Sequence, residues 1–191
     1  MGVFGNVLGN NLTHHLTVTN PIIASSITLS PGTIVNESSV AGGVAWTNID
    51  NVKVDDNNFA EAVLSNKVSQ YLKVTNFGFS IPIIATINGI KVEIKRSYVG
   101  NDPLNPTDFR LNIVKSNGTR GLINKSIASE PWSENDSYVI RGSNVDKWGE
   151  TWTASDINST NFGFAISVGT EGPFGTCTAR INHIRITVYF S

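Results

Sequence analysis

Two stretches of the chain share one order of apolar and polar positions. Residues 75–94 and residues 160–188 each contain Asn-Phe-Gly-Phe, followed after a gap by Ile-Asn-x-Ile and a run in which every second residue is apolar. A period of two is typical of a β-strand with one face in a core and the other in water. Each copy therefore predicts two successive strands. The repetition predicts an all-β fold, an antiparallel β-sandwich with two related halves.

The alternating runs also predict which side chains form the core. We expect their apolar positions to be buried beside the phenylalanines of the two Asn-Phe-Gly-Phe copies. The intervening positions, such as Lys91, Glu93 and Arg185, are expected to face water. The expected core residues are Ile90, Val92, Ile94, Ile184, Ile186, Val188, Phe77, Phe79, Phe162 and Phe164.

Weaker patterns predict the remaining elements. Alternation or β-branched residues, bounded by turn residues such as Asn20-Pro21 and Ser116-Asn117-Gly118, indicate further strands. Residues 154–159, entered by Thr153, predict one helical turn. The further strands are expected within residues 22–29, 33–45, 63–74 and 109–114.

Composition narrows the class of protein. Only 15% of the 191 residues are charged, and the formal net charge is −1. Because a nucleic-acid surface and an electrostatic membrane anchor both need clustered Lys and Arg, we expect neither nucleic acid nor a membrane as a partner. No apolar run approaches the ~18 residues of a transmembrane helix, and the first residues lack the pattern of a signal peptide. The length fits one large β domain, placed at residues 21–191.

Residues 1–20 are interpreted as an extended N-terminal arm. They are rich in Gly and Asn, and residues 12–19 alternate between apolar and polar side chains. A neighbouring subunit could use such an arm as an added strand; the alternative, given equal weight, is the domain's own first edge strand. We expect contacts with a partner to order the arm through its apolar side chains, namely Val3, Phe4, Val7, Leu8, Leu12, Leu16 and Val18.

Residues suited to catalysis are few. The chain has a single cysteine, Cys177, and three histidines, of which His183 is expected at the start of a strand. It contains no Gly-x-Ser-x-Gly, no His-Glu-x-x-His and no phosphate-binding glycine loop. Carboxylates such as Glu130 and Glu150 are present, but the sequence does not show that any two of them converge. We expect a protein that is not an enzyme and that has no cofactor and no metal.

Two features favour ligand binding more specifically. Residues 50–58 are dense in carboxylates and amides, as calcium loops are, but they lack the EF-hand spacing; the alternative is a set of Asx turns. Among the four tryptophans, Trp148 and Trp152 are expected in the core. Trp132, which follows Pro131, is the best candidate for an exposed ring on which a sugar could stack.

Several short motifs follow one another in order over roughly residues 45–191. They are Trp46-Thr-Asn, Asp55-Asp56, Asn76-Phe-Gly-Phe-Ser-Ile-Pro, Ala85-Thr-Ile-Asn-Gly-Ile-Lys-Val-Glu-Ile, Trp148-Gly, Trp152-Thr, Asn161-Phe-Gly-Phe and Ile184-Arg-Ile-Thr-Val-Tyr. This order resembles a jelly-roll module of structural proteins of tailed bacteriophages and of surface proteins of environmental bacteria. The motifs consist of turn glycines, core aromatic residues and strand alternation. The resemblance therefore implies a fold and no catalytic or ligand-binding residues.

The resemblance implies a non-enzymatic structural protein of a virion: a capsid decoration, head-fibre or tail-associated subunit. We expect it to form a homo-oligomer, a trimer, and to be held by its arm to other virion proteins such as the major capsid protein. Two alternatives stay open. One is a carbohydrate-binding module of an extracellular bacterial protein, which would bind surface glycans through Trp132. The other is a subunit of a bacterial surface filament joined by donated strands.

Overall fold

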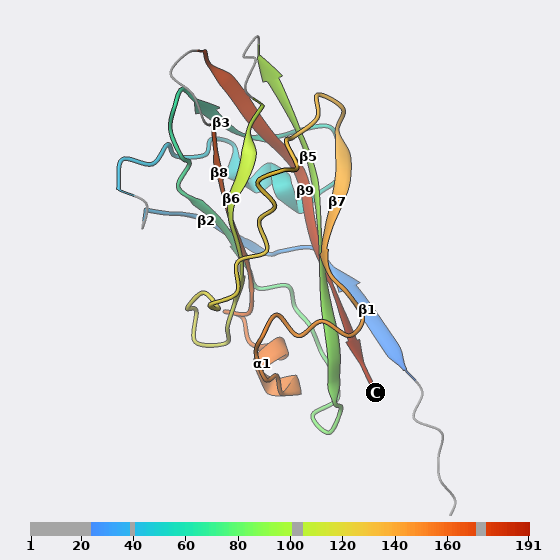
Figure 1. Ribbon diagram of the computed structural model, residues 1–191. Helices are drawn as coiled ribbons and strands as arrows, with labels where there is room; N and C mark the ends of the chain where they lie inside the picture. Colours follow the sequence, from blue (N-terminus) through green and yellow to red (C-terminus); the bar gives the residue numbers. More distant parts are fainter. Residues whose placement is uncertain (1–23, 39–40, 101–104, 171–174) are drawn as a thin grey trace, which may run out of the picture.

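The computed structural model describes residues 24–38, 41–100, 105–170 and 175–191. These residues form two antiparallel sheets that pack face to face (Figure 1). The prediction of an all-β sandwich is confirmed, whereas the jelly-roll connectivity stays a prediction. The N-terminal arm, its boundary at residue 20 and its expected partner-binding side chains lie outside the described residues.

Each sheet is built from strands that are far apart in the sequence. The first sheet has the order β1-β9-β5-β7, and β3 pairs with the half of β9 that β1 does not reach. The second sheet has the order β2-β4-β8-β6. The first sheet contains β1 (Ser25–Leu29), β3 (Ala60–Leu64), β5 (Ile87–Gly100), β7 (Ser137–Gly142) and β9 (Cys177–Phe190). The second sheet contains β2 (Thr33–Glu37), β4 (Tyr71–Thr75), β6 (Thr107–Val114) and β8 (Gly163–Gly169).

The two repeated stretches lie side by side. Strand β5 comes from the first copy and β9 from the second, and the two pair along nearly their whole length, with Val92 opposite Ile186. Strand β4, which precedes the first Asn-Phe-Gly-Phe, pairs in the other sheet with β8, which begins inside the second. Corresponding strands of the two copies, β5 and β9, are therefore neighbours in the first sheet, and in the second sheet β4 and β8, which flank or enter the two Asn-Phe-Gly-Phe copies, are neighbours.

The first Asn-Phe-Gly-Phe copy is not a strand, which corrects the prediction. Asn76 and Gly78 have φ angles of 57° and 75°, a left-handed conformation that ends β4 at Thr75. In the second copy Gly163 lies inside the sheet, and an added Cβ would come within 2.0 Å of the carbonyl oxygen of Val74. One glycine thus permits a turn and the other permits two strands to approach closely.

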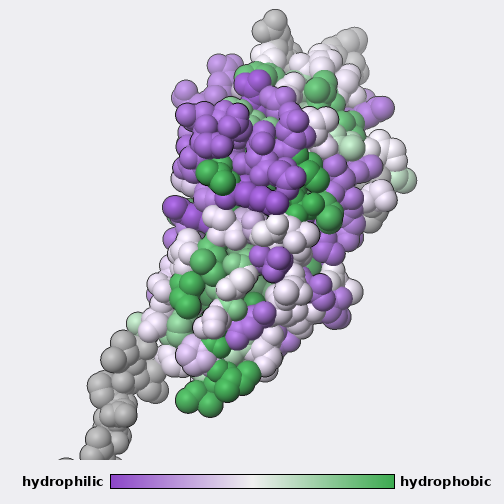
Figure 2. All heavy atoms as spheres, turned by 180° about the vertical axis from the view of Figure 1, so that it is seen from behind, coloured by the Kyte–Doolittle hydropathy of each residue, from purple (hydrophilic) through white to green (hydrophobic). Residues whose placement is uncertain are grey.

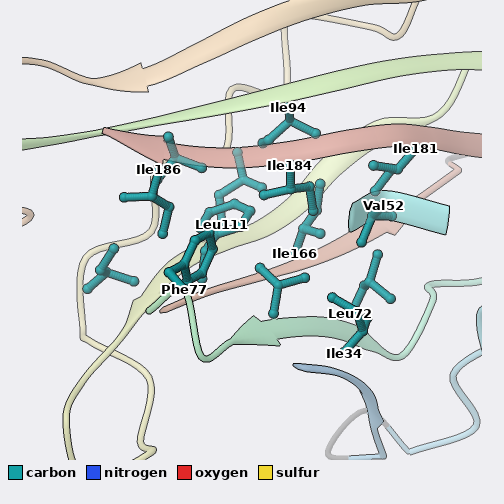
Figure 3. Close-up of a cluster of buried hydrophobic side chains, with 14 of the residues drawn as sticks. Ile34, Val52, Leu72, Phe77, Ile94, Leu111, Ile166, Ile181, Ile184 and Ile186 are labelled. Atoms are coloured by element: carbon teal, nitrogen blue, oxygen red, sulfur yellow. The ribbon is translucent and has the colours of Figure 1, made fainter. Parts of the chain in front are cut away.

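The core lies between the sheets where the alternation places it. Every residue of the expected core is buried, including the phenylalanines of both copies. Figure 3 shows Ile94, Ile184 and Ile186 of the β5–β9 layer facing Leu72 and Ile166 of the opposite layer. At one end the core is closed by edge-on aromatic contacts, with ring centroids 5.4 Å apart for Trp152 and Phe162 and 5.9 Å apart for Phe79 and Phe162.

The opposite face of β5 and β9 is less exposed than predicted. Glu93 and Thr187 are buried, while Lys91 and Arg185 are partly covered. The reason is that these polar side chains cover one another: the Arg185 guanidinium donates to Glu93 at 3.0 Å, and Lys91 lies 3.0 Å from the same carboxylate. Alternation gave the correct direction of these side chains but not their exposure.

The helical elements are short. The helical turn predicted after Thr153 is α1 (Ala154–Asn158), and a capping box between Thr153 and Asp156 starts it. A 3-10 helix, η1 (Ile49–Lys53), packs Val52 into the core. In the part of the chain that the structure describes, no helix has the length and apolar content needed to cross a bilayer.

Candidate functional site

A buried group of charges joins the two sheets near their edges. Asp108 on β6 is ion-paired with Arg96 on β5 and, at 2.9 Å, with Arg141 on β7. The indole N–H of Trp132 donates to the same carboxylate at 2.8 Å, and the Arg96 guanidinium lies 4.9 Å from the Trp132 ring centroid. Glu130, which is partly exposed, also contacts both arginines. We call Arg96, Asp108, Trp132 and Arg141 the clasp, because they connect three strands of two sheets.

A β-bulge places Asp108 in the clasp. The pairing of β6 with β8 shifts register between Asp108 and Arg110, so that Asp108 lies opposite Val168 and Arg110 opposite Ser167. The extra residue, Phe109, lets Asp108 point into the sandwich while Arg110 points out of it. We expected the strand at residues 109–114 to alternate from Phe109, but Phe109 is exposed for this reason.

The expectation that Trp132 offers an exposed ring is wrong. Its side chain is 1% exposed, because the clasp carboxylate binds its indole N–H and Arg96 covers its ring. Trp148 and Trp152 are buried as expected. In the described structure, therefore, Trp132 provides no platform for a sugar.

A second polar cluster covers the outer face of the first sheet. His183 lies inside β9, not at a strand start, and is hydrogen-bonded on both ring nitrogens: Nε2 to Ser30 Oγ at 2.8 Å and Nδ1 to Tyr138 Oη at 2.7 Å. Tyr138 donates to Asp55 Oδ2 at 3.2 Å, and the Lys95 ammonium lies 2.6 Å from Asp55 Oδ1. The hydrogen bond from Lys95 lowers the pKa of Asp55.

The order of these bonds assigns the histidine tautomer. Because the Tyr138 hydroxyl gives its proton to Asp55, His183 donates from Nδ1 to Tyr138 and accepts from Ser30 at Nε2. His183 Nε2 beside the Ser30 hydroxyl is placed as a general base beside a nucleophile would be. Acyl transfer, however, also needs N–H groups that stabilise an oxyanion. The nearby N–H of Gly32 is engaged by the carbonyls of Thr75 and Asn76. We interpret the cluster as a polar ladder that covers the sheet.

The ladder makes stability depend on pH. Burial lowers the pKa of His183 below its usual 6.5, although Asp55 and Glu93 oppose the shift while Arg185 and Lys95 add to it. Below pH 6.5 His183 therefore binds a proton more readily in the unfolded chain than in the folded chain. The free energy of unfolding falls as pH falls for this reason. We expect the melting temperature to decrease between pH 7.5 and pH 5.5, and to decrease less in His183→Gln. Equal decreases in both proteins would contradict this assignment.

The carboxylates of residues 50–58 do not converge on one point. Asp50 pairs with Lys53 at 2.7 Å, Asp55 with Lys95, and Asp56 accepts from the backbone N–H of Asn58 at 3.1 Å. Among the described residues no three His, Cys, Asp or Glu side chains gather as a metal site would require. The last of these contacts is the Asx type of turn that the sequence allowed as the alternative.

Exposed apolar residues gather at one end of the first sheet. There β1 starts, β9 ends and β5 begins, with Ser25 and Ile87 both paired to Phe190. The turn before β5 presents Ile83 and Ile84, which are 70% and 92% exposed. Nearby, Ala24, Asn88, Val145 and Tyr189 help to line a hollow of about 410 Å³. Figure 2 shows the apolar surface at this lower end and the more polar surface above it.

Comparisons with known proteins assign no family. No protein-family model matches the chain, and no curated protein matches it. Among solved structures, the chain is similar to the tripod (BppUct-A-L) from the baseplate of bacteriophage Tuc2009, with a TM-score of 0.35 and 13% identity. The similarity covers 86% of this chain and 63% of that one, less than two thirds of its length. At this TM-score the likeness carries no inference about function.

Proposed function

We propose that the chain is a non-enzymatic structural protein of a virion, such as a capsid decoration, head-fibre or tail-associated subunit. In this proposal the sandwich is the displayed body, and the N-terminal segment attaches it to its particle. The order of motifs described above motivates the choice of a virion. The observation that carries the proposal is the apolar end of the first sheet.

The turn at this end is fixed rather than loose. The N–H of Ala85 donates to the Pro82 carbonyl at 2.9 Å, and Thr86 exchanges two backbone hydrogen bonds with Ser191. Three consecutive apolar residues, Pro82, Ile83 and Ile84, are nevertheless exposed. Such a run is unfavourable on a free surface and is typical of a surface that another protein covers.

Strand β1 adds a second means of attachment at the same end. It pairs with β9 along one side and lies at the end of the strand order of its sheet. Among the described residues no strand pairs with its other side, and such an edge can accept a strand from another chain through backbone hydrogen bonds. The segment that precedes Ala24 joins the described fold here, so an arm and an apolar turn would act together. We propose that this end joins the copies of a homo-oligomer, expected to be a trimer, and holds them to the virion.

The proposal predicts that each of two changes abolishes assembly without unfolding the sandwich. Deleting residues 1–20, or replacing Ile83 and Ile84 together by serine, should leave a folded monomer that no longer assembles. The physical reason is that each change removes apolar contact area from the interface and leaves the core intact. Light scattering coupled to size-exclusion chromatography would give the oligomeric state, and circular dichroism would confirm the fold. Val54→Ser, at another exposed apolar residue, is the matched control.

The assignment to a virion needs its own measurement. Mass spectrometry and immunogold microscopy of purified particles from the strain that carries the gene should detect the protein at defined positions. Detection on the cell surface instead would favour the filament subunit, which also uses donated strands. Unchanged assembly of both altered proteins would show that attachment lies elsewhere on the sandwich.

A further inference from the structure

The outer face of the second sheet holds a polar trough along β6. One hollow of about 570 Å³ is lined by Tyr71, Arg110, Asn112, Arg120 and other residues. A second hollow, of about 240 Å³, lies beside Thr107 and Ser126. Arg110 and Asn124 line both, so the two hollows adjoin. The volume of the larger one is within the range of sites for small ligands.

The positive charge in this trough is only partly compensated. Arg120 is paired with Glu37, which also takes the Lys73 ammonium at 3.3 Å. Arg110 lies within salt-bridge distance of no carboxylate among the described residues, and its guanidinium packs 5.1 Å from the ring centroid of Phe109. Of the two arginines that line the larger hollow, only Arg120 is thus paired with a carboxylate of the described residues. A guanidinium free to donate in parallel is suited to a carboxylate or a sulfate.

The bulge that builds the clasp also exposes this arginine. Because Asp108 turns inward, Arg110 points outward beside Asn112, with its backbone held in the β6–β8 pairing opposite Ser167. The segment across the trough, residues 119–125, is bonded to β6 as well. Asn112 donates to the carbonyls of Gly121 and Ile123, and the N–H of Lys125 donates to the Leu111 carbonyl. The trough is therefore built from ordered backbone on both sides.

The rest of the lining fits a hydroxylated ligand. Asn112, Thr119 and Asn124 line the larger hollow. The Asn112 amide and the Thr119 hydroxyl donate to Gly121, Ile123 and Asn117, which leaves their oxygens as acceptors for the hydroxyls of a ligand, and Leu122 beside them is 93% exposed. Polar groups that hydrogen-bond sugar hydroxyls, next to apolar groups that contact the C–H faces of a ring, are what saccharide recognition requires. We propose that this trough binds an acidic saccharide, with Arg110 receiving its carboxylate or sulfate group. The site does not depend on the proposed virion function, and Trp132 has no part in it.

The test compares an acidic disaccharide with its neutral counterpart and with an inorganic anion. The probes are a disaccharide containing glucuronate, the same disaccharide with glucose in place of glucuronate, and inorganic sulfate. They would be titrated into the full chain by calorimetry and by amide chemical shifts of residues 110–124. We expect the acidic disaccharide to bind about tenfold or more tightly than the neutral one, since a charge-assisted hydrogen bond supplies at least that discrimination.

Two variants localise the binding. Arg110→Gln, at an exposed position, should leave the melting temperature unchanged and weaken the binding of the acidic disaccharide by about tenfold or more. Arg185→Gln removes an arginine from the other sheet, where Arg185 is paired with Glu93, and should bind the disaccharide as the parent does. The proposal is overturned if the neutral disaccharide binds equally well, if Arg110→Gln binds normally, or if sulfate binds and neither saccharide does, which would indicate a simple anion site.

Discussion

Replacing Asp108 by asparagine should lower the free energy of unfolding by about 3–5 kcal/mol. The change keeps the size of the side chain but removes the carboxylate that Arg96 and Arg141 share in the clasp. Both arginine side chains are almost fully buried, at 3% and 6% exposure, and burial already lowers the pKa of Arg96. Glu130 is too exposed to replace the missing charge, so two cations would remain without full compensation. Chemical denaturation of both proteins measures the difference.

Asp50→Asn is the matched control for this change. Asp50 is also ion-paired, to Lys53, but its side chain is 75% exposed. Exposed pairs contribute less than about 1 kcal/mol, so this variant should unfold close to the parent. If the two variants lose the same stability, the clasp does not hold the sheets together.

Replacing Ile186 by alanine should cost about 2–5 kcal/mol. Ile186 is fully buried, lies opposite both Leu29 and Val92, and faces the other sheet (Figure 3). Truncating the side chain leaves a cavity that the paired strands β1 and β5 and the facing sheet cannot close without moving. The same substitution at Ile84, which is almost fully exposed, should change the stability by less than about 0.5 kcal/mol. An unchanged denaturation midpoint for Ile186→Ala would mean that the register assigned to β9 is wrong.

The core could be predicted because its signal is local and repeated. In β5 and β9 the period of two continues over several residues and occurs twice, so chance agreement is small. The short helix after Thr153 was equally accessible, since a capping residue and its partner lie within one turn. Both patterns depend on residues close together in sequence.

The parts that could not be predicted depend on residues far apart. The two Asn-Phe-Gly-Phe copies are identical over four residues, yet one turns and one enters a strand, because only Gly163 is pressed against β4. Trp132 is buried by a carboxylate on β6 and an arginine on β5. The single residue that shifts β6 at Phe109 reverses the directions of Asp108 and Arg110, and neither the clasp nor the trough follows from alternation without it.

The position of β9 determines when this protein can fold. β9 is translated after β1, β3 and β5, yet it is the strand to which all three of them pair. The hydrogen bond between the Thr28 and Thr187 hydroxyls spans 159 positions, a separation typical of slowly forming contacts. Until β9 emerges from the ribosome, the first sheet lacks its central strand, and β1 and β3 have no strand to pair with. A chain terminated early therefore cannot form this sheet, which would restrict any assembly to subunits whose synthesis has passed β9.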